Sequence, residues 1–451
     1  MASSSCQHRY VAHRSCGRCL LISIPPLFVI FAFSLLFLGS RLWGEWPAYA
    51  NFHLLSLPPF NSSSSYLSET TSKTHSSPYS FDIEASSHPD WMSGAPDDWS
   101  LALLSLPGTH DTLTHRVHSE WYQCQNSALA TQLRAGVRYL DVRARVQIPP
   151  SPSKRGEGEP WPLGIYHGDA YTGYGFAEVV STVFAFLDAN PSEIVVLRLK
   201  EEAKPIVGSV GDPPGVRPTT SSTSGNSSTS SPDWWQQFNN SAQTQPSLFE
   251  ASFNRYRLND SRTASGFSDH LYRFPSDDGT GSLPPTRIPT VGELRGKVLL
   301  LQEFPNFKAA SHVPTYFGIP WQLSSALLQV EDLWQIADMA HLEKKWSAIR
   351  ENLQAAGKAA DDDSKSMPLF LSHLSASVGV TPINAAAGHG SVVGMNDRTG
   401  QWVAASHDKV DEASKDDKQH QPPVGIVIAD FPGHRLVEAV LQRNNFTREL
   451  F

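Results

Sequence analysis

Cysteine is scarce in this chain, and most of it lies at one end. The 451 residues include only four cysteines, and three of them, Cys6, Cys16 and Cys19, fall within the first 19 positions. Cys124 is therefore alone in the long C-terminal region, which excludes a disulfide framework within that region. We expect Cys124 to be a small buried apolar residue.

An excess of positive charge is also missing. The chain has 36 Lys and Arg against 44 Asp and Glu, which gives a formal net charge of −8 and a pI near 6.1. A nucleic-acid-binding protein needs a basic face, so this balance argues against nucleic-acid partners. Hydrophobic residues make up 40% of the chain, which is enough for the core of a large globular domain.

A long hydrophobic run is present near the N-terminus. Cys19 to Ser40 is 22 residues long without a charge, and the residues before it include three arginines and no acidic residue. About 20 apolar residues span a bilayer as a helix, and flanking basic residues keep their side in the cytosol. We predict a cytosolic tail at 1–18, an uncleaved transmembrane signal anchor at 19–40 and a luminal or extracellular remainder. A cleaved signal peptide and a secreted protein are the alternative.

The remainder divides into a stalk and a folded domain. Residues 41–88 are rich in Ser and Thr, which is typical of a flexible stalk. We expect the domain at 89–451, with insertions of low order near 203–290 and 385–422. Asn-x-Ser/Thr triplets beyond the hydrophobic run predict a glycoprotein. They lie at Asn61, Asn226, Asn239, Asn259 and Asn445.

Between the insertions, short apolar runs alternate with helical patterns. Alternating or continuous apolar runs predict strands, and apolar residues at helical spacing predict helices. Strands that alternate with helices are typical of a parallel sheet covered by helices, and a closed α/β barrel is one solution. The predicted strands are 136–145, 193–202, 296–304 and 424–431, and the predicted helices are 176–191, most of 330–357, and 434–444.

Polar residues recur at the ends of the predicted strands. Asp141 and Arg143 share one strand face, and Leu140 and Val142 share the other. Active sites of parallel barrels lie at the C-terminal ends of the strands, so we expect a site at this edge. The other polar residues placed there are His110 and Asp111, after the apolar run 101–106 and a turn at Pro107-Gly108, and His167, Lys200, Glu202 and Asp430.

These side chains suit phosphoryl chemistry. One histidine can remove a proton from an attacking hydroxyl while a second protonates the leaving oxygen. A carboxylate can fix the tautomer of each histidine, and Arg and Lys can hold the charge of the phosphate. A purely structural role for an inward-facing Asp141–Arg143 pair is the alternative.

The order of the segments resembles the phosphatidylinositol-specific phospholipase C X-domain family in its bacterial-like, single-domain form. The resemblance lies in LLSLPGTHDT (103–112), QLRAGVRYLDVRAR (132–145), YHGDAYTGYGFAEVVSTVFAFLDANPSEIVVLRLKEE (166–202), LRGKVLLLQEF (294–304), VEDLW (330–334) and VGIVIADFPGHRLVEAVLQRNN (424–445). It implies a distorted TIM (β/α)8-like barrel. It also implies cleavage of an inositol phospholipid at a membrane surface into diacylglycerol and a cyclic inositol phosphate.

The resemblance assigns acid–base roles to particular residues. His110 matches the general base, and Asp430 matches the carboxylate that orients it. His167 matches the general acid, which Asp111 assists. All four residues are therefore expected to meet at the mouth of the barrel.

The resemblance also implies how the phosphate charge is stabilised. One group in this superfamily uses calcium, and the other uses an arginine. Arg143 matches that arginine, and Asp141 lies on the same strand face, where the metal-dependent group would keep a further acidic ligand. A guanidinium has a fixed charge and a planar fork of donors that fits phosphate oxygens. We therefore expect no metal ion and no cofactor.

Two departures from the family concern the headgroup. Lys200 and Asp332 match positions that touch the inositol ring. Gln302-Glu303, however, stand where bacterial members carry an arginine that grips inositol, and Trp334 stands where they stack a tyrosine. Phosphatidylinositol, a glycosylated inositol lipid or another phosphodiester are therefore all open as substrates.

Two other functions fit the same residues less well. A glycerophosphodiester phosphodiesterase would need His-Arg-Gly near the first strand, but Val117 follows His115-Arg116. A membrane-tethered lipid-binding protein without turnover would not need to retain His110 and His167. The sequence therefore favours an enzyme.

Overall fold

The computed structural model describes most of the predicted domain. It covers residues 77–148, 161–207, 247–275, 284–304, 307–308, 313–314, 316–321, 325–364, 366–411 and 421–451. All of them belong to one unit, Ser62–Phe451. Across these ranges no helix is long and apolar enough to cross a bilayer. The predicted tail, membrane span and most of the predicted stalk lie outside the described residues.

Parallel strands form the central sheet of the described chain. Their order is β10-β7-β5-β2-β1-β17-β13-β11, so the last strand, β17, pairs with the first, β1. This is the order of a (β/α)8 barrel, and in the described residues the sheet is open between β10 and β11. The strands are β1 (Leu106–Thr109), β2 (Tyr139–Ile148), β5 (Ile194–Glu201), β7 (Lys297–Glu303), β10 (Ile319–Pro320), β11 (Leu328–Glu331), β13 (Leu369–His373) and β17 (Ile426–Ala429).

An antiparallel hairpin extends the sheet beside β2. Its strands are β3 (Leu163–His167) and β4 (Ala170–Gly175), and β3 pairs with β2. His167 therefore lies at the tip of this hairpin. The remaining short strands are β6 (Ile206–Val207), β8 (Phe307–Lys308), β9 (Val313–Pro314), β12 (Gln335–Ile336), β14 (Ser377–Val378), β15 (Gly388–His389) and β16 (Val392–Val393).

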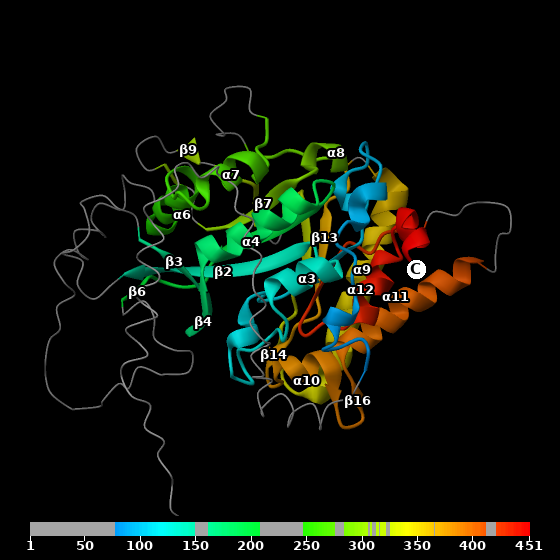
Figure 1. Cartoon of the computed structure of the whole chain (residues 1–451). Coiled ribbons are helices and arrows are strands. Elements are labelled where there is room, and N and C mark those ends of the chain that lie inside the picture. Colours follow the sequence, from blue (N-terminus) through cyan, green and yellow to red (C-terminus); the bar gives the residue numbers. More distant parts are fainter. Residues whose placement is uncertain are drawn as a thin grey trace, which may run out of the picture. The chain divides into compact units, whose positions relative to one another are not determined.

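Helices cover the sheet in two groups. Figure 1 shows α4, α6 and α7 together near β2 and β7, and α9, α11 and α12 gathered beside one another. In α4 the apolar residues at helical spacing are buried, and the helix ends before Asn190-Pro191. The helices are α3 (Leu129–Ala135), α4 (Phe176–Ala189), α6 (Leu248–Leu258), α7 (Ala264–His270), α8 (Val291–Leu294), α9 (Leu342–Asp363), α10 (Pro382–Ala387), α11 (Met395–Asp411) and α12 (His434–Leu441).

The turn predicted at Pro107-Gly108 is wrong, because both residues belong to β1. The run before it forms a single 3-10 turn, Leu101–Leu103. Pro107 is tolerated because the N–H groups that bond to β17 and its flanks are those of Leu106 and His110, on the other side of the strand. At Gly108 a Cβ would lie 2.9 Å from the Cβ of Tyr139, so the close packing of β1 on β2 needs a glycine.

Other elements also differ from the sequence-based expectation. Residues 328–331 form strand β11, so the helix predicted within 330–357 begins only at Leu342. Both predicted insertions contain ordered helices: α6 and α7 in the first, and α11 in the second. These helices bury Phe253, Phe267 and Val403 against the core, which polar composition alone conceals.

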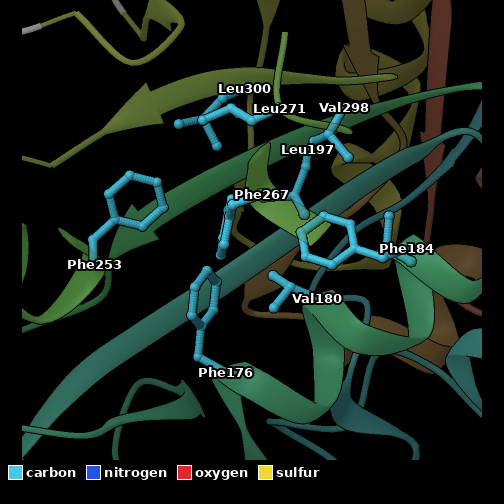
Figure 2. A pocket seen from close by; sticks show the side chains of 10 residues that line it. Phe176, Val180, Phe184, Leu197, Phe253, Phe267, Leu271, Val298 and Leu300 are labelled. Carbon is cyan, nitrogen blue, oxygen red and sulfur yellow. The ribbon is translucent and has the colours of Figure 1, made fainter. Parts of the chain in front are cut away.

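The apolar core between α4, α7 and the sheet contains a small pocket (Figure 2). Aromatic rings from α4, α6 and α7 face side chains of β5 and β7 there, and every lining residue is apolar. Its volume is about 10 Å³, which is the size of a single water probe. This pocket is a packing defect without polar groups, so it carries no chemistry.

A buried ion pair lies at the other end of the sheet, before β2 and β5 begin. Arg138 donates to the carboxylate of Glu193 through Nε and Nη2 at 2.7 Å, and both side chains are fully buried. The guanidinium also donates to four backbone carbonyls, and Glu193 accepts from the backbone N–H of Met92 at 2.9 Å. Every charge there is paired, which makes this a structural cluster.

Candidate active site

The segment after β1 brings His110 and Asp111 to the mouth of the sheet. The backbone N–H of His110 donates to the carbonyl of Ala429 at 3.1 Å, so His110 continues the pairing with β17. Asp111 then adopts a φ of +42°, a left-handed conformation that Asp tolerates better than most residues. Its N–H lies 3.3 Å from Asp141 Oδ2, which ties this turn to β2.

The surroundings of His110 fix its tautomer. Nδ1 lies 2.8 Å from Asp430 Oδ1, and Nε2 lies 2.7 Å from Arg143 Nη2. A guanidinium can only donate hydrogen bonds, so Nε2 must be the acceptor and Nδ1 carries the proton toward Asp430. These two contacts assign His110 as a neutral imidazole with its lone pair on Nε2, and Asp111 Oδ2 lies 3.2 Å from the same nitrogen.

His167 has the opposite surroundings. Nδ1 lies 2.9 Å from the carbonyl of Tyr122, and Nε2 lies 3.3 Å from Asp111 Oδ2. Both nitrogens face oxygen atoms, and Cys124 Sγ lies 3.9 Å from Nδ1. Glu202 accepts from the N–H of Gly168 at 2.8 Å and so holds the hairpin tip in place.

Arg143 lies beside His110 and among carboxylates. Its Nη2 and Nε lie 2.8 and 3.1 Å from Asp141 Oδ2, and its Nε lies 3.1 Å from Asp111. Glu202 is 3.8 Å from Nη1. The ring centroids of His110 and His167 are 6.2 Å apart, and Asp111 Oδ2 lies 3.2 and 3.3 Å from their Nε2 atoms.

The charges of the carboxyl groups differ because their surroundings differ. Burial raises the pKa of Asp111 to about 6, and burial together with the charge of Asp111 raises that of Asp430 well above its ordinary value. Burial would also raise the pKa of Asp141, but two neighbouring guanidinium groups hold it well below its usual range. Burial lowers the pKa of His110. Asp141 therefore stays ionised where Asp111 changes charge near pH 6.

The structure brings together the six residues predicted to be catalytic, but places the predicted headgroup residues differently. Lys200 reaches the cluster through Glu202, at 2.7 Å. Within the described residues no hydrogen bond or ion pair joins Asp332 or Trp334 to the cluster, and Trp334 is 46% exposed. Cys124 is free and buried, as expected.

Several polar residues near the site were not assigned a role from the sequence. Gln125 Nε2 donates to the carbonyls of His110 and Ala429 and so braces the first loop. The buried ring of His373 lies 6.3 Å from that of His110. The sequence places Glu202 at a strand end without a role, because only Lys200, two positions before it, matches a headgroup position of the family. Only side-chain geometry shows these contacts, since none of these residues has a distinctive spacing.

A metal ion would fit this site poorly. His110, Asp111 and Cys124 offer ligand atoms within 4.8 Å of one another. Arg143, however, lies 2.7 Å from His110 Nε2 and 3.1 Å from Asp111, and its positive charge opposes a cation. Burial also raises the pKa of the Cys124 thiol, whereas a metal needs the thiolate.

Comparisons with known proteins show similarity to one family. Residues 106–207 match the family described as "Phosphatidylinositol-specific phospholipase C, X domain". The chain is 28% identical over 364 residues to a 1-phosphatidylinositol phosphodiesterase of Listeria monocytogenes, covering 79% of this chain and 85% of that protein. It is 29% identical over 139 residues to a human PI-PLC X domain-containing protein 1, covering 24% and 40% of the two chains.

A solved structure shares the fold. The phosphatidylinositol-specific phospholipase C from Listeria monocytogenes aligns over 79% of this chain and 99% of its own, with a TM-score of 0.52 and 23% identity. The matched segment contains β1, β2, the hairpin and β5, which carry five of the six clustered residues. Residues 106–207 thus resemble the phosphatidylinositol-specific phospholipase C X domain, and the chain as a whole is similar in sequence and fold to the protein from Listeria monocytogenes.

Proposed function

We propose that the chain cleaves the phosphodiester of an inositol phospholipid and releases diacylglycerol and a cyclic inositol phosphate. The observation that carries this proposal is the contrast between the two histidines. Nε2 of His110 lies 2.7 Å from the donor Arg143 Nη2, whereas the hydrogen-bond partner of His167 at 2.9 Å is the carbonyl of Tyr122. Asp111 Oδ2 lies 3.2 and 3.3 Å from the Nε2 atoms of the two rings. A base and an acid on either side of a phosphate-binding fork are what phosphodiester cleavage by an internal hydroxyl requires.

The reaction is a displacement at phosphorus. His110 Nε2 takes the proton of the ring hydroxyl next to the phosphate, and that oxygen bonds to phosphorus. The bond from phosphorus to the glycerol oxygen breaks, and His167 gives its Nε2 proton to that leaving oxygen. Asp430 Oδ1 lies 2.8 Å from Nδ1 of His110 and stabilises the imidazolium that forms there. Asp111, next to Nε2 of His167, is the carboxyl group whose surroundings change when His167 gives up its proton.

Arg143 supplies the charge for the phosphorane. In the free protein its Nη2 occupies the lone pair of His110 Nε2. A bound phosphate draws that donor to its own oxygens and so frees the base. Coupling base release to phosphate binding keeps the base from taking a proton until the diester is in place. Lys200, Asp332 and Trp334 remain the proposed headgroup contacts, with phosphatidylinositol or a glycosylated form as the ligand.

Turnover of defined vesicles tests the proposal. Full-length protein is incubated with vesicles of phosphatidylinositol in phosphatidylcholine, with pure phosphatidylcholine as the control, and water-soluble phosphates are followed by phosphorus NMR. The expected result is a cyclic phosphodiester signal from the inositol vesicles alone. Binding to those vesicles without any product would instead support a lipid-binding protein, and cleavage of phosphatidylcholine would point to another headgroup.

A membrane anchor at 19–40 with the domain on the luminal or extracellular side is also proposed, supported by the hydrophobic run and the acceptor asparagines. Asn259 is exposed at the end of α6. Glycosidase treatment should therefore increase the mobility of the native protein, and Asn259→Gln should remove one step of that shift. Absence of a shift, with release from membranes by alkaline carbonate, would contradict this topology, and a shift with release would support secretion.

A further inference from the structure

A second buried guanidinium lies beside the proposed catalytic cluster, and the reaction scheme does not use it. Arg198 on β5 is level with Asp141 on β2 in the register of the sheet. Its side chain is only 6% exposed. Nε and Nη2 lie 2.7 and 2.6 Å from one oxygen of Glu303, and the guanidinium carbon lies 4.0 Å from the ring centre of Trp321. Burial, the ion pair and the stacked ring hold the guanidinium in one orientation.

The remaining nitrogen of Arg198 points at the cluster. Nη1 lies 3.4 Å from Asp141 Oδ1, and neither atom has a hydrogen-bond partner in the described part of the chain. The other oxygen of Asp141 serves Arg143 and the N–H of Asp111. The two oxygens of this carboxylate are therefore divided between two guanidinium groups.

This division differs from that of a structural ion pair. Arg138, at the other end of the sheet, donates hydrogen bonds to Glu193 and to backbone carbonyls. Arg198 keeps one nitrogen free of hydrogen bonds and aimed at a carboxylate that orients Arg143. Oδ2 already accepts from Nε and Nη2 of Arg143. Without Arg198, Oδ1 would lose the cation that faces it, so the carboxylate would be free to rotate and Arg143 would shift with it.

We propose that Arg198 is a positioning residue, which holds Asp141 so that Arg143 keeps its fork directed at the phosphate. This inference rests on the proposed function, because it assigns Arg198 a part in the same reaction. Glu303 and Trp321 fix Arg198, Arg198 fixes Asp141, and Asp141 fixes Arg143. A phosphorane carries more negative charge than the bound diester, so a displaced fork lowers kcat more than it raises KM.

A double-mutant cycle tests this chain of contacts. In full-length protein, Arg198→Met should lower kcat about 10- to 100-fold, the range for a misplaced catalytic group, with KM within about threefold. Arg143→Lys removes the fork, so adding Arg198→Met to it should lower kcat no further. Arg262→Met, at an exposed arginine paired with Asp260, is the matched control and should leave kcat unchanged.

A milder variant keeps the test decisive if Arg198→Met does not fold. Glu303 is 28% exposed, and Glu303→Gln keeps an oxygen acceptor for Arg198, which still faces Asp141 at 3.4 Å, so this variant loosens only one side of Arg198. It should lower kcat severalfold and should also add nothing to Arg143→Lys. Effects that multiply in either cycle, or a rise in KM at constant kcat, would overturn the proposal.

Failure of the proposed function would be seen separately. If the unmutated protein does not turn over phosphatidylinositol vesicles, that function fails, and calorimetric titration with inorganic phosphate decides on Arg198. Weaker phosphate binding in Arg198→Met that does not recur in the Arg143→Lys background would support the positioning role. Binding losses that add, or no phosphate binding by the unmutated protein, would overturn it.

Discussion

Removal of each histidine should cost activity by an amount that its contacts determine. Positioned acid–base groups contribute about 10²–10⁴-fold to rate, or about 3 to 5 kcal/mol. His110 contacts Arg143 and Asp430 at 2.7 and 2.8 Å, so His110→Ala also removes a support of the phosphate fork and should lie at the upper end. His167 has one contact at 2.9 Å and one at 3.3 Å, so His167→Ala should lie nearer the lower end.

The leaving group separates the two roles. A glycerol alkoxide needs a proton as it departs, whereas a nitrophenolate does not. With an inositol phosphate ester of p-nitrophenol, His167→Ala should recover to within about tenfold of the unmutated rate, and His110→Ala should not recover, because only the acid becomes dispensable.

Both assays need a histidine control and a folding control. His341 forms an exposed pair with Asp338 at 2.7 Å, so His341→Ala should leave both rates unchanged, and melting curves should match among all variants. Equal recovery of His110→Ala and His167→Ala, or recovery of His110→Ala alone, would refute the assignment of base and acid.

Three further results are expected. EDTA should leave the rate nearly unchanged while Arg143→Lys lowers it at least tenfold, since a point charge lacks the fork; restoration by calcium after EDTA would contradict this. The pKa of Asp111 is raised to about 6, and this carboxyl group must be ionised beside His167. The value of kcat/KM should therefore rise with pH through about 6, and Asp111→Asn should abolish this rise. Glu193→Ala should lower the free energy of unfolding by about 3–5 kcal/mol in urea titrations, since it strands the buried charge of Arg138, whereas Glu343→Ala at an exposed pair should cost under about 1 kcal/mol.

The parts of the fold that the sequence predicts well are those with a strong apolar period. The helix at 176–191 and the strands at 193–202 and 296–304 were recovered within a few residues. Each has a continuous apolar pattern and sharp ends, such as Asn190-Pro191. Chain order then leads to the barrel, because right-handed crossovers place successive parallel strands beside one another.

The mispredicted parts are those where tertiary packing outweighs local composition. Pro107 and Gly108 are turn formers in isolation, yet β1 tolerates the missing N–H of Pro107 and needs the missing Cβ of Gly108. The segment holding α6 and α7 reads as polar, although buried aromatic residues such as Phe249, Phe253 and Phe267 supply its core face. A few buried aromatics suffice to order a helix that composition assigns to a loop.

The site was predictable where residue type and strand position coincide, as for Asp141 and Arg143 on alternate positions of β2. It was not predictable where a residue acts across the sheet. Arg198 lies in a strand that reads as apolar except for its end, and its partners are more than 50 positions away along the chain, on β2 and β7. Pairing of that kind depends on register, which no local pattern specifies.

Register also explains how carboxylates come to lie near the cations around the mouth. It places Asp141 opposite Arg198, and Lys200 opposite both Arg143 and Glu303. Each inward cation of β2 and β5 therefore has a carboxylate on an adjacent strand or two positions along its own. A diester entering this ring meets no large net positive charge, so tight binding of the ground state is not what the mouth provides. Its hydrogen-bond donors and guanidinium groups are instead fixed in position for the negative charge that develops at phosphorus during the reaction. This arrangement stabilises the transition state more than the bound lipid.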